Sequence, residues 1–327
     1  MNAFDLLRPK TVDAAVIALT ADAPPTIKAG GVDLLDRMKE GIATPKQLLD
    51  ILPLADLRGI GPEDGKVKIG ALATLAELGE SALLRDKGLG IVAEAARTAA
   101  TPQVRAQATV GGNLHQHNRC WYYRLADQEP CLMRGGKECF AKDGRNKIHA
   151  IFGTDAPCVA VDPSSLAPVF LALDAVAVYK TLGGAVPLAM DKVLVQGRNS
   201  VEATNLGVLT HVLVPVKDGR RSAFLEFGER DGYDWSLAAC AVSWIAKGDA
   251  CSEVRIVLGG VALTARRCVE AEKLLEGQKL TADLASKVAA KALEGAKPLA
   301  ENGYKVPVAR TLVQRALLAA AGMEGKK

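Results

Sequence analysis

The N-terminal part of the chain alternates short segments with helical and with extended patterns of apolar residues. Residues 11–19 have apolar side chains at helical spacing, with Thr11 placed as the N-cap, and residues 26–29 form a short extended run. Residues 32–40 then predict a helix that begins directly after Gly30 and Gly31. Because a strand, a glycine turn and a helix N-terminus together point backbone N–H groups outward, this segment predicts an anion-binding turn.

The alternation continues toward the middle of the chain. Residues 67–71 alternate like a strand, residues 74–80 predict a helix capped by Thr74, and the alanine-rich residues 91–100 predict another helix. Residues 107–110 look extended and lead into a second glycine pair, Gly111 and Gly112. After a stretch rich in turn residues, residues 167–173 are apolar and residues 175–179 predict a strand.

The pattern changes beyond a polar turn at residues 217–221, so we expect two domains, residues 1–217 and residues 221–325. In the second, residues 222–227 and 254–261 predict strands, and residues 237–245 are an apolar strand or helix. The segments that follow predict amphipathic helices, at residues 264–275, 280–293 and 306–320. Strands followed by helices are typical of an α+β domain.

Composition adds limits on the kind of protein. The chain has 327 residues, of which 49% are hydrophobic and 24% charged, and its net charge of +4 is small and dispersed. That charge argues against a nucleic-acid surface. No apolar run approaches the about 20 residues of a membrane-spanning helix. Asp5 and Asp13 make the N-terminal segment unlike a signal peptide, and we expect a cytoplasmic protein, with export in complex with a signal-bearing partner as the alternative.

The two glycine pairs are candidates for holding a dinucleotide. Phosphate needs close approach by backbone N–H groups, which glycine permits because it has no Cβ. The turns at residues 28–35 and 109–113 could face each other across a pyrophosphate. Neither is a G-x-G-x-x-G fingerprint, so a Rossmann site is not indicated. One glycine pair is more often only a tight turn, and the presence of two favours the dinucleotide.

Four of the seven cysteines crowd into 39 residues, at Cys120, Cys131, Cys139 and Cys158. Gaps of ten, seven and eighteen residues separate them, unlike the C-x-x-C pairs of zinc ribbons and bacterial ferredoxins. A long turn-rich loop needs something to organise it, and thiolates on a metal would do so. On spacing alone, an iron–sulfur cluster, a structural zinc and four unrelated thiols all remain open.

The other residues near the cysteines predict less chemistry. His115, His117 and His149 are expected beside the ligands or at the surface rather than as ligands. Arg119, Arg134 and Lys137 could tune a cluster electrostatically, although charges on a loop are more often solvated. The odd cysteine count favours free thiols in a reducing compartment, with three expected in the core, at Cys240, Cys251 and Cys268.

Six segments resemble the FAD-binding medium subunit of the molybdenum hydroxylases, the family of xanthine dehydrogenase and CO dehydrogenase flavoprotein subunits. They are KAGGVDLL at 28–35, IGALATLAEL at 69–78, QATVGGNL at 107–114, PSSLAPVFLALDA at 163–175, ERDGYDWSLAACAV at 229–242 and NGYKVPVARTLVQRAL at 302–317. The cysteine-rich stretch is similar to that of the members with an added 4Fe-4S cluster, the aldehyde oxidoreductase and 4-hydroxybenzoyl-CoA reductase type.

The resemblance implies an α+β fold. A vanillyl-alcohol-oxidase (PCMH) type FAD-binding domain in two subdomains would occupy residues 1–217, with the cysteine-rich 4Fe-4S loop at residues 115–160. A small α+β domain of the CO dehydrogenase flavoprotein C-terminal type would follow at residues 221–325.

The resemblance also implies the cofactor sites. Cys120, Cys131, Cys139 and Cys158 would hold the 4Fe-4S cluster, and no residue of this chain would be catalytic. The residues implied for FAD are Lys28, Ala29, Gly30, Gly31, Val32, Asp33, Leu34, Leu35, Thr74, Thr101, Thr109, Val110, Gly111, Gly112, Asn113, Ser165, Leu166 and Glu226. Two of these depart from the family pattern, which usually has Asp at Ser165 and Lys at Glu226.

The implied function is electron transfer within a larger complex. This chain would pass electrons between the 2Fe-2S clusters of a small partner subunit and an external acceptor, while a large subunit with the molybdenum cofactor carries out the substrate chemistry. No nucleic acid and no membrane span are expected. The alternative is a flavin-free, zinc-stabilised scaffold or assembly subunit of the same complex.

Overall fold

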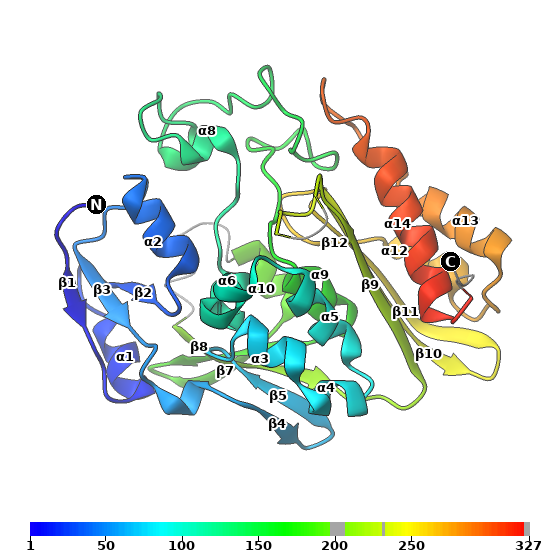
Figure 1. Ribbon diagram of the computed structural model, residues 1–327, viewed down its shortest axis with the longest axis horizontal. Coiled ribbons are helices and arrows are strands. Elements are labelled where there is room, and N and C mark those ends of the chain that lie inside the picture. Colours follow the sequence, from blue (N-terminus) through cyan, green and yellow to red (C-terminus); the bar gives the residue numbers. More distant parts are fainter. Residues whose placement is uncertain (197–206, 231–232, 324–327) are drawn as a thin grey trace.

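The computed structural model describes residues 1–196, 207–230 and 233–323. Figure 1 shows three β-sheets, with the N-terminal sheet at one end of the molecule and the C-terminal sheet with its helices at the other. The turn-rich stretch that carries α8 lies along the top of this view, between α2 and the start of α14. Among these described residues, no helix combines the length and the apolar character needed to cross a bilayer.

The N-terminal subdomain is a three-stranded parallel sheet in the order β1-β3-β2. Its strands are β1 (Asp5–Leu7), β2 (Thr26–Lys28) and β3 (Gln47–Asp50), and its helices are α1 (Val12–Ala18) and α2 (Val32–Lys39). Parallel strands need crossover connections, and the two helices provide them. Thr11 caps α1 through its side chain, as predicted, and α2 begins directly after Gly31. The predictions for residues 11–19, 26–29 and 32–40 are therefore confirmed.

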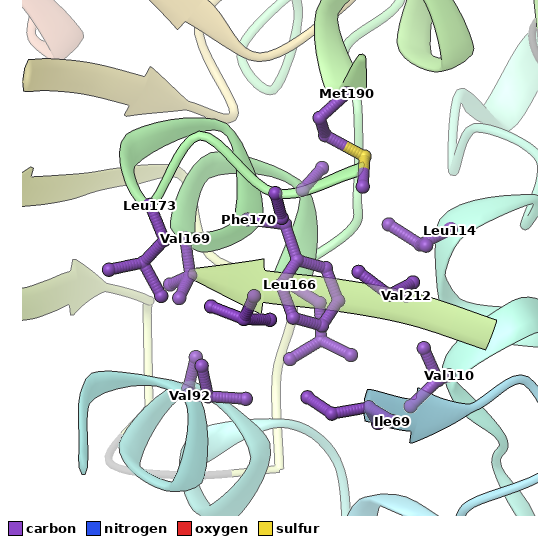
Figure 2. Packing of buried hydrophobic residues seen from close by; sticks show 14 of the residues in the cluster. Ile69, Val92, Val110, Leu114, Leu166, Val169, Phe170, Leu173, Met190 and Val212 are labelled. Atoms are coloured by element: carbon purple, nitrogen blue, oxygen red, sulfur yellow. The ribbon is translucent and has the colours of Figure 1, made fainter. Parts of the chain in front are cut away.

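The second subdomain is a five-stranded antiparallel sheet covered by helices. Its strands follow the order β4-β5-β8-β6-β7: β4 (Ile60–Glu63), β5 (Lys66–Gly70), β8 (Val208–Pro215), β6 (Val176–Thr181) and β7 (Gly184–Ala189). The helices are α3 (Leu75–Glu80), α4 (Ala82–Asp86), α5 (Gly90–Thr98), α6 (Pro102–Gln107), α7 (Val110–Leu114), α9 (Leu166–Ala172) and α10 (Met190–Gln196), with a 3₁₀ turn η1 (Ala55–Leu57). Every residue of α9 is buried, and Figure 2 shows Phe170 packed near Ile69 and Val212 of the sheet.

The C-terminal domain is an antiparallel sheet, β12-β11-β10-β9, followed by three helices. The strands are β9 (Arg220–Phe227), β10 (Ala238–Lys247), β11 (Ala250–Gly259) and β12 (Arg266–Arg267), and the helices are α12 (Val269–Leu275), α13 (Ala282–Ala292) and α14 (Lys305–Ala320). α14 packs on one face of β9 and β10, and α9 of the preceding domain packs on β10 and β11. Burial on both faces explains the apolar run at residues 237–245, which is a strand. The predicted α+β order is confirmed.

The three cysteines outside the cluster lie in the core of this domain. Cys240, Cys251 and Cys268 are buried and pack in one hydrophobic cluster with α12, α13 and α14. Their prediction as small core residues is confirmed.

Two predictions of local structure were wrong. Residues 107–110 are not a strand, because Thr101 caps α6 with Pro102 in its first turn, and Thr109 then caps α7, which contains Gly111 and Gly112. Only an isolated bridge between Thr109 and Thr74 remains of the expected extended segment. The expected helix at residues 264–275 begins instead as β12, because pairing with the open edge of β11 overrides helical propensity there.

Candidate functional site

A cavity of about 630 Å³ is lined by both glycine turns, by strands of the first two sheets and by the connection between β9 and β10. The predicted residues along its wall come from three segments: Ala29, Gly30, Gly31, Val32, Asp33 and Leu34; Thr101, Thr109, Gly111, Gly112 and Asn113; and Ser165. Residues 29–34 and 109–113 contain the two glycine pairs and the helix starts that follow them. We call these two segments together the glycine cradle. A cavity of this volume is in the range of cofactor sites.

The first half of the glycine cradle packs closely against the backbone that leads into the second half. A Cβ at Gly30 would overlap the carbonyl oxygen of Gln107, so only glycine allows this approach. Gly31 has φ of 82°, in the left-handed region, and it supplies no side chain to cap α2 in the part of the chain that the structure describes. The first-turn N–H groups of α2 are therefore available to an anion. In the other half, Thr109 Oγ1 accepts the Gly112 N–H at 3.1 Å.

Ser164 and Asn113 fix the far wall of the cavity. The Ser164 hydroxyl donates to Asn113 Oδ1 at 2.6 Å, and the Leu166 N–H donates to the same oxygen at 3.3 Å. Both Asn113 and Ser164 are buried. These bonds tie the second half of the cradle to the start of α9, where Ser165 faces the cavity.

The structure places the remaining six predicted residues away from the cavity wall, at Lys28, Leu35, Thr74, Val110, Leu166 and Glu226. Val110 and Leu166 are core residues, and Thr74 caps α3 in a capping box with Glu77. The Lys28 ammonium donates to Asp50 at 3.0 Å.

Glu226 on β9 lies next to the cavity rather than on its wall. Burial raises the pKa of its carboxyl, and hydrogen bonds with Thr98 and Ser236 oppose that rise. Ser236 itself lines the cavity.

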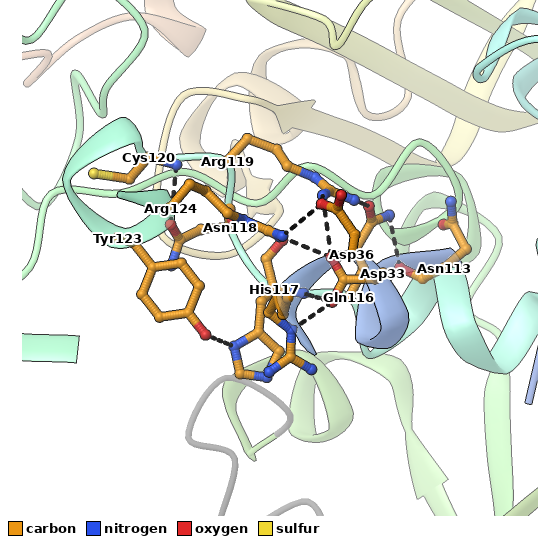
Figure 3. Close-up of polar contacts among 11 residues, drawn as sticks. Asp33, Asp36, Asn113, Gln116, His117, Asn118, Arg119, Cys120, Tyr123 and Arg124 are labelled. Carbon is orange, nitrogen blue, oxygen red and sulfur yellow. Dashed lines mark hydrogen bonds and ion pairs between the residues drawn. The ribbon is translucent and has the colours of Figure 1, made fainter. Parts of the chain in front are cut away.

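The ion pairs that Asp33 of the cradle forms with three arginines were not predicted from the sequence. Asp33, in the first turn of α2, forms ion pairs with Arg37 (3.0 Å), Arg119 (3.1 Å) and Arg124 (2.7 Å). Figure 3 shows Asp33 between Arg119 and Arg124, which flank Cys120 in the sequence. Burial raises the pKa of Asp33, but the arginine charges outweigh it and hold the pKa below its ordinary value. Arg119 was considered as a solvated loop charge, whereas it is largely buried here.

Aromatic residues from the C-terminal domain close the cavity on another side. Tyr233 and Trp235, in the connection between β9 and β10, line it, and the Arg119 guanidinium stacks 4.5 Å from the centre of the Trp235 ring. Sequence reasoning had no signal for this contact, because the two residues are 116 positions apart and neither belongs to a glycine turn.

The four clustered cysteines all lie in the loop at residues 115–160, which we call the cysteine loop. It contains only a short helix, α8 (Trp121–Arg124), and a 3₁₀ turn, η2 (Leu132–Arg134). Cys120 and Cys131 are buried, while Cys139 and Cys158 are half-buried and share a hydrogen bond between their sulfurs. That shared bond lowers the pKa of Cys139 and raises the pKa of Cys158. Burial raises the pKa of Cys120 to about 11.

Backbone N–H groups point at three of these sulfurs. They act to lower the pKa values of the thiols, from Tyr122 and Tyr123 at Cys120, from Ala141 and Val159 at Cys139, and from Ala160 at Cys158. In each case one donor lies two residues after the cysteine. Such bonds stabilise thiolates, the form in which cysteine binds metal.

The sulfurs do not converge on one point. Within the described ranges, no three His, Cys, Asp or Glu side chains are close enough together to hold a single metal ion. A second cavity, of about 380 Å³, lies between Cys120, His149 and Trp235, and it shares Arg119 and Trp235 with the larger one. The cysteine loop and the large cavity are therefore neighbours.

The C-terminal domain holds the end of the cysteine loop through buried polar side chains. Asn302 donates to the carbonyls of His149 (3.1 Å) and Ala150 (3.0 Å), and the Lys305 ammonium donates to Ile148 (2.8 Å) and Gly260 (2.9 Å). The Asn146 N–H donates to the Glu301 carboxylate, and the Glu301 N–H donates to the Asn146 side-chain oxygen. Burial lowers the pKa of Lys305 to about 7. Burial, and then the Lys305 charge, lower the pKa of His149 to about 4.

Comparison with known proteins identifies both domains. Residues 2–217 match the family described as the FAD binding domain in molybdopterin dehydrogenase, and residues 223–320 match the CO dehydrogenase flavoprotein C-terminal domain. The aldehyde oxidoreductase FAD-binding subunit PaoB of Escherichia coli is 31% identical over 95% of this chain and 96% of its own length. The carbon monoxide dehydrogenase medium chain of Hydrogenophaga pseudoflava is 29% identical over 97% of this chain and 96% of its own length.

Solved structures agree with these sequence matches. A carbon monoxide dehydrogenase structure from Hydrogenophaga pseudoflava superposes with a TM-score of 0.78 at 27% identity, covering 99% of each chain. A structure of a Cu,Mo-CO dehydrogenase superposes with a TM-score of 0.76 at 26% identity, again covering 99% of each chain. The expected fold class, an FAD-binding domain followed by the flavoprotein C-terminal domain, is confirmed.

Proposed function

The chain belongs to the family of FAD-binding medium subunits of the molybdenum hydroxylases, and from that premise we propose that it carries two redox centres, an FAD and a 4Fe-4S cluster. It passes electrons between the 2Fe-2S clusters of a small partner subunit and an external acceptor. Substrate chemistry takes place on the molybdenum cofactor of a large partner subunit. None of the seven cysteines, all of which the structure describes, forms a disulfide, which suits a reducing compartment, and we place the complex in the cytoplasm.

The FAD part of the proposal rests on the glycine cradle. The uncapped first turn of α2 offers N–H groups to the pyrophosphate, and residues 109–113 cover it from the opposite side. The twelve predicted residues on the cavity wall contact the dinucleotide. Ser165 keeps a hydroxyl where the family usually has a carboxylate, so the wall carries one negative charge fewer there.

The cluster part rests on the cysteine loop. Cys120, Cys131, Cys139 and Cys158 supply four thiolates, and the backbone donors described above fit a negatively charged sulfur set. FAD can take up or release either one or two electrons, whereas a 4Fe-4S cluster transfers one electron at a time. The observation that carries the proposal is the position of the cysteine loop, because Cys120 lines a cavity that shares Arg119 and Trp235 with the cavity lined by both glycine turns.

A flavin-free, zinc-stabilised scaffold is not favoured. Zinc is bound by four ligands around one point, and no three candidate side chains in the described segments meet that condition. The cavity beside the cradle also has no role in a flavin-free protein.

Anaerobic purification of the full chain, followed by an absorption spectrum and analysis of iron, sulfide and zinc, tests the proposal. We expect flavin bands and about four iron and four sulfide per chain. Zinc without a flavin band would overturn it and establish the scaffold. Flavin without iron would leave FAD binding intact and remove the cluster.

A further inference from the structure

His149 is not one of the proposed cluster ligands, but its side chain contacts one of them, Cys120. Its Nε2 lies 3.1 Å from Cys120 Sγ, and the residue is 1% exposed. Its ring packs against Trp121 and Tyr122, with centroids 5.8 Å and 6.4 Å away. We propose that His149 donates a hydrogen bond through Nε2 to Cys120 Sγ and thereby raises the reduction potential of the cluster. This inference rests on the proposed 4Fe-4S function.

The direction of the bond follows from the surroundings of the ring. In the described part of the chain, the other ring nitrogen, Nδ1, is buried without a hydrogen-bond partner. A proton on Nδ1 would be a buried donor with no acceptor, whereas a proton on Nε2 finds the sulfur. A thiolate that binds metal can only accept. The neutral imidazole therefore carries its proton on Nε2 when Cys120 is a ligand.

The backbone of His149 is held rigidly enough to keep the ring in place. Asn302 donates to its carbonyl, and its own N–H donates to Asn146 at 3.0 Å. Lys305 holds the preceding carbonyl, at Ile148. Asn302 and Lys305 belong to the C-terminal domain and are both fully buried. His149 is thus a positioning residue that acts on the cluster through Cys120.

The expected effect of the bond is on the potential. Taking up one electron makes the cluster and its thiolates more negative, so a donor to sulfur stabilises the reduced state more than the oxidised state. A hydrogen bond to a charged group changes an equilibrium by about tenfold. For a one-electron couple, a tenfold change corresponds to about 59 mV.

The test is a redox titration monitored by electron paramagnetic resonance on the anaerobically purified full chain. His149→Leu should lower the midpoint potential by about 59 mV, a tenfold change. His149→Gln, whose amide can donate to the same sulfur, should restore a value near wild type. Tyr304→Phe is the matched control, because it removes a bond to the same loop, at the Lys147 carbonyl, without contact to sulfur. Its potential should not change.

A second measurement needs no variant. Pulsed resonance on wild-type protein with ¹⁵N-labelled histidine should detect one coupled nitrogen and an exchangeable proton. If the wild-type protein shows neither the coupled nitrogen nor the exchangeable proton, the inference is overturned. This measurement decides the matter even if His149→Leu fails to bind the cluster. A full iron content with an unchanged potential in His149→Leu would overturn this inference alone. Wild-type chain without iron would overturn the cluster proposal as well.

Discussion

The glycine cradle and the cysteine loop are neighbours, yet they are held in place by different kinds of contact. The cradle consists of helix first turns fixed by nearby backbone bonds, such as Gly111 N–H to Ala71 (2.8 Å) and Val110 N–H to Ala73 (2.9 Å). The cysteine loop has little regular structure and is held by Asn302 and Lys305, more than 150 residues away in the sequence. Local signals therefore suffice for the cradle, whereas the loop depends on the second domain and on its proposed metal.

The two regions are joined at Asp33. This carboxylate lies in the first turn of α2 and binds Arg119 and Arg124 of the cysteine loop. Its Oδ2 also accepts the His117 N–H at 3.2 Å. Two hydrogen bonds from the start of the loop also reach the cradle, from His115 to the Gly111 carbonyl (2.8 Å) and from Gln116 to the Asn113 carbonyl (3.0 Å). Of these contacts, the buried Asp33 group carries the most charge.

The largest expected effect is the loss of the cluster while the cradle stays intact. Cys139→Ser should remove nearly all iron and sulfide, because it removes one of four proposed ligands. Flavin should remain near one per chain, because the cavity wall is built on regular elements. Iron analysis and the flavin absorbance measure both. Cys251→Ala, a buried cysteine in the C-terminal core, is the control and should keep its iron. Full iron and sulfide in Cys139→Ser would show that the ligand assignment is wrong.

Removing the Asp33 carboxylate should affect both the glycine cradle and the cysteine loop. Asp33→Ala leaves three arginines without their shared carboxylate, and removing one partner of a buried pair costs about 3–5 kcal/mol. We expect a lower free energy of unfolding in a denaturant titration, together with loss of both flavin and iron. Asp13→Ala, which removes an exposed ion pair with Lys180, should cost under about 1 kcal/mol. Retention of both cofactors by Asp33→Ala would contradict the coupling.

A change confined to the cradle should spare the cluster. Gly30→Ala places a Cβ against the Gln107 carbonyl, and overpacking costs about 1–3 kcal/mol. If about 2.8 kcal/mol of this cost is lost from the binding free energy of FAD, the affinity for FAD drops about 100-fold. Flavin titration measures the affinity, and iron content should not change. Gly90→Ala, where a Cβ meets open space, is the matched control. Tight FAD binding by Gly30→Ala would contradict the close approach of the two turns.

The smallest expected effect, per unit of pH, is the pH dependence of the contact that holds the cysteine loop. Lys305 has a pKa of about 7 in the folded chain, below its ordinary value of 10.5, so between these values the unfolded chain binds more protons. Stability should therefore rise with pH from about 7 to about 10, by at most about 1.4 kcal/mol per pH unit. Comparing the unfolding free energy of wild type and Lys305→Met across this range isolates the contribution. Parallel curves for the two proteins would contradict it.

Much of the fold could be predicted because its signals are local. Thr11 and Thr74 cap their helices, and β5, β6 and α14 follow the periodicity of the sequence. The misses were the short elements, such as β1 and β12, whose few residues pair with strands elsewhere in the chain. Their extended state comes from partners that no local window contains.

The candidate site was predicted only in part, for the same reason. Both glycine turns line one cavity, yet the second is part of α7 rather than the end of a strand. Glu226 and Lys28 lie off the wall, since Lys28 reaches Asp50 and Glu226 bonds Thr98 and Ser236. The cysteine ligand set and the remaining FAD contacts stay predictions, as does the domain boundary between residues 217 and 221.

The sequence by itself determined the helix starts, the two glycine turns, the cysteine count and, through its resemblance, the family. These follow from residue types within a few positions of one another, where capping and backbone freedom act. Only the tertiary structure decided that Asp33 would pair with Arg119 and Arg124, and that Asn302 and Lys305 would hold the loop beside His149. Buried charges and amides are stable only with partners, and those partners come from segments that meet only when the chain folds.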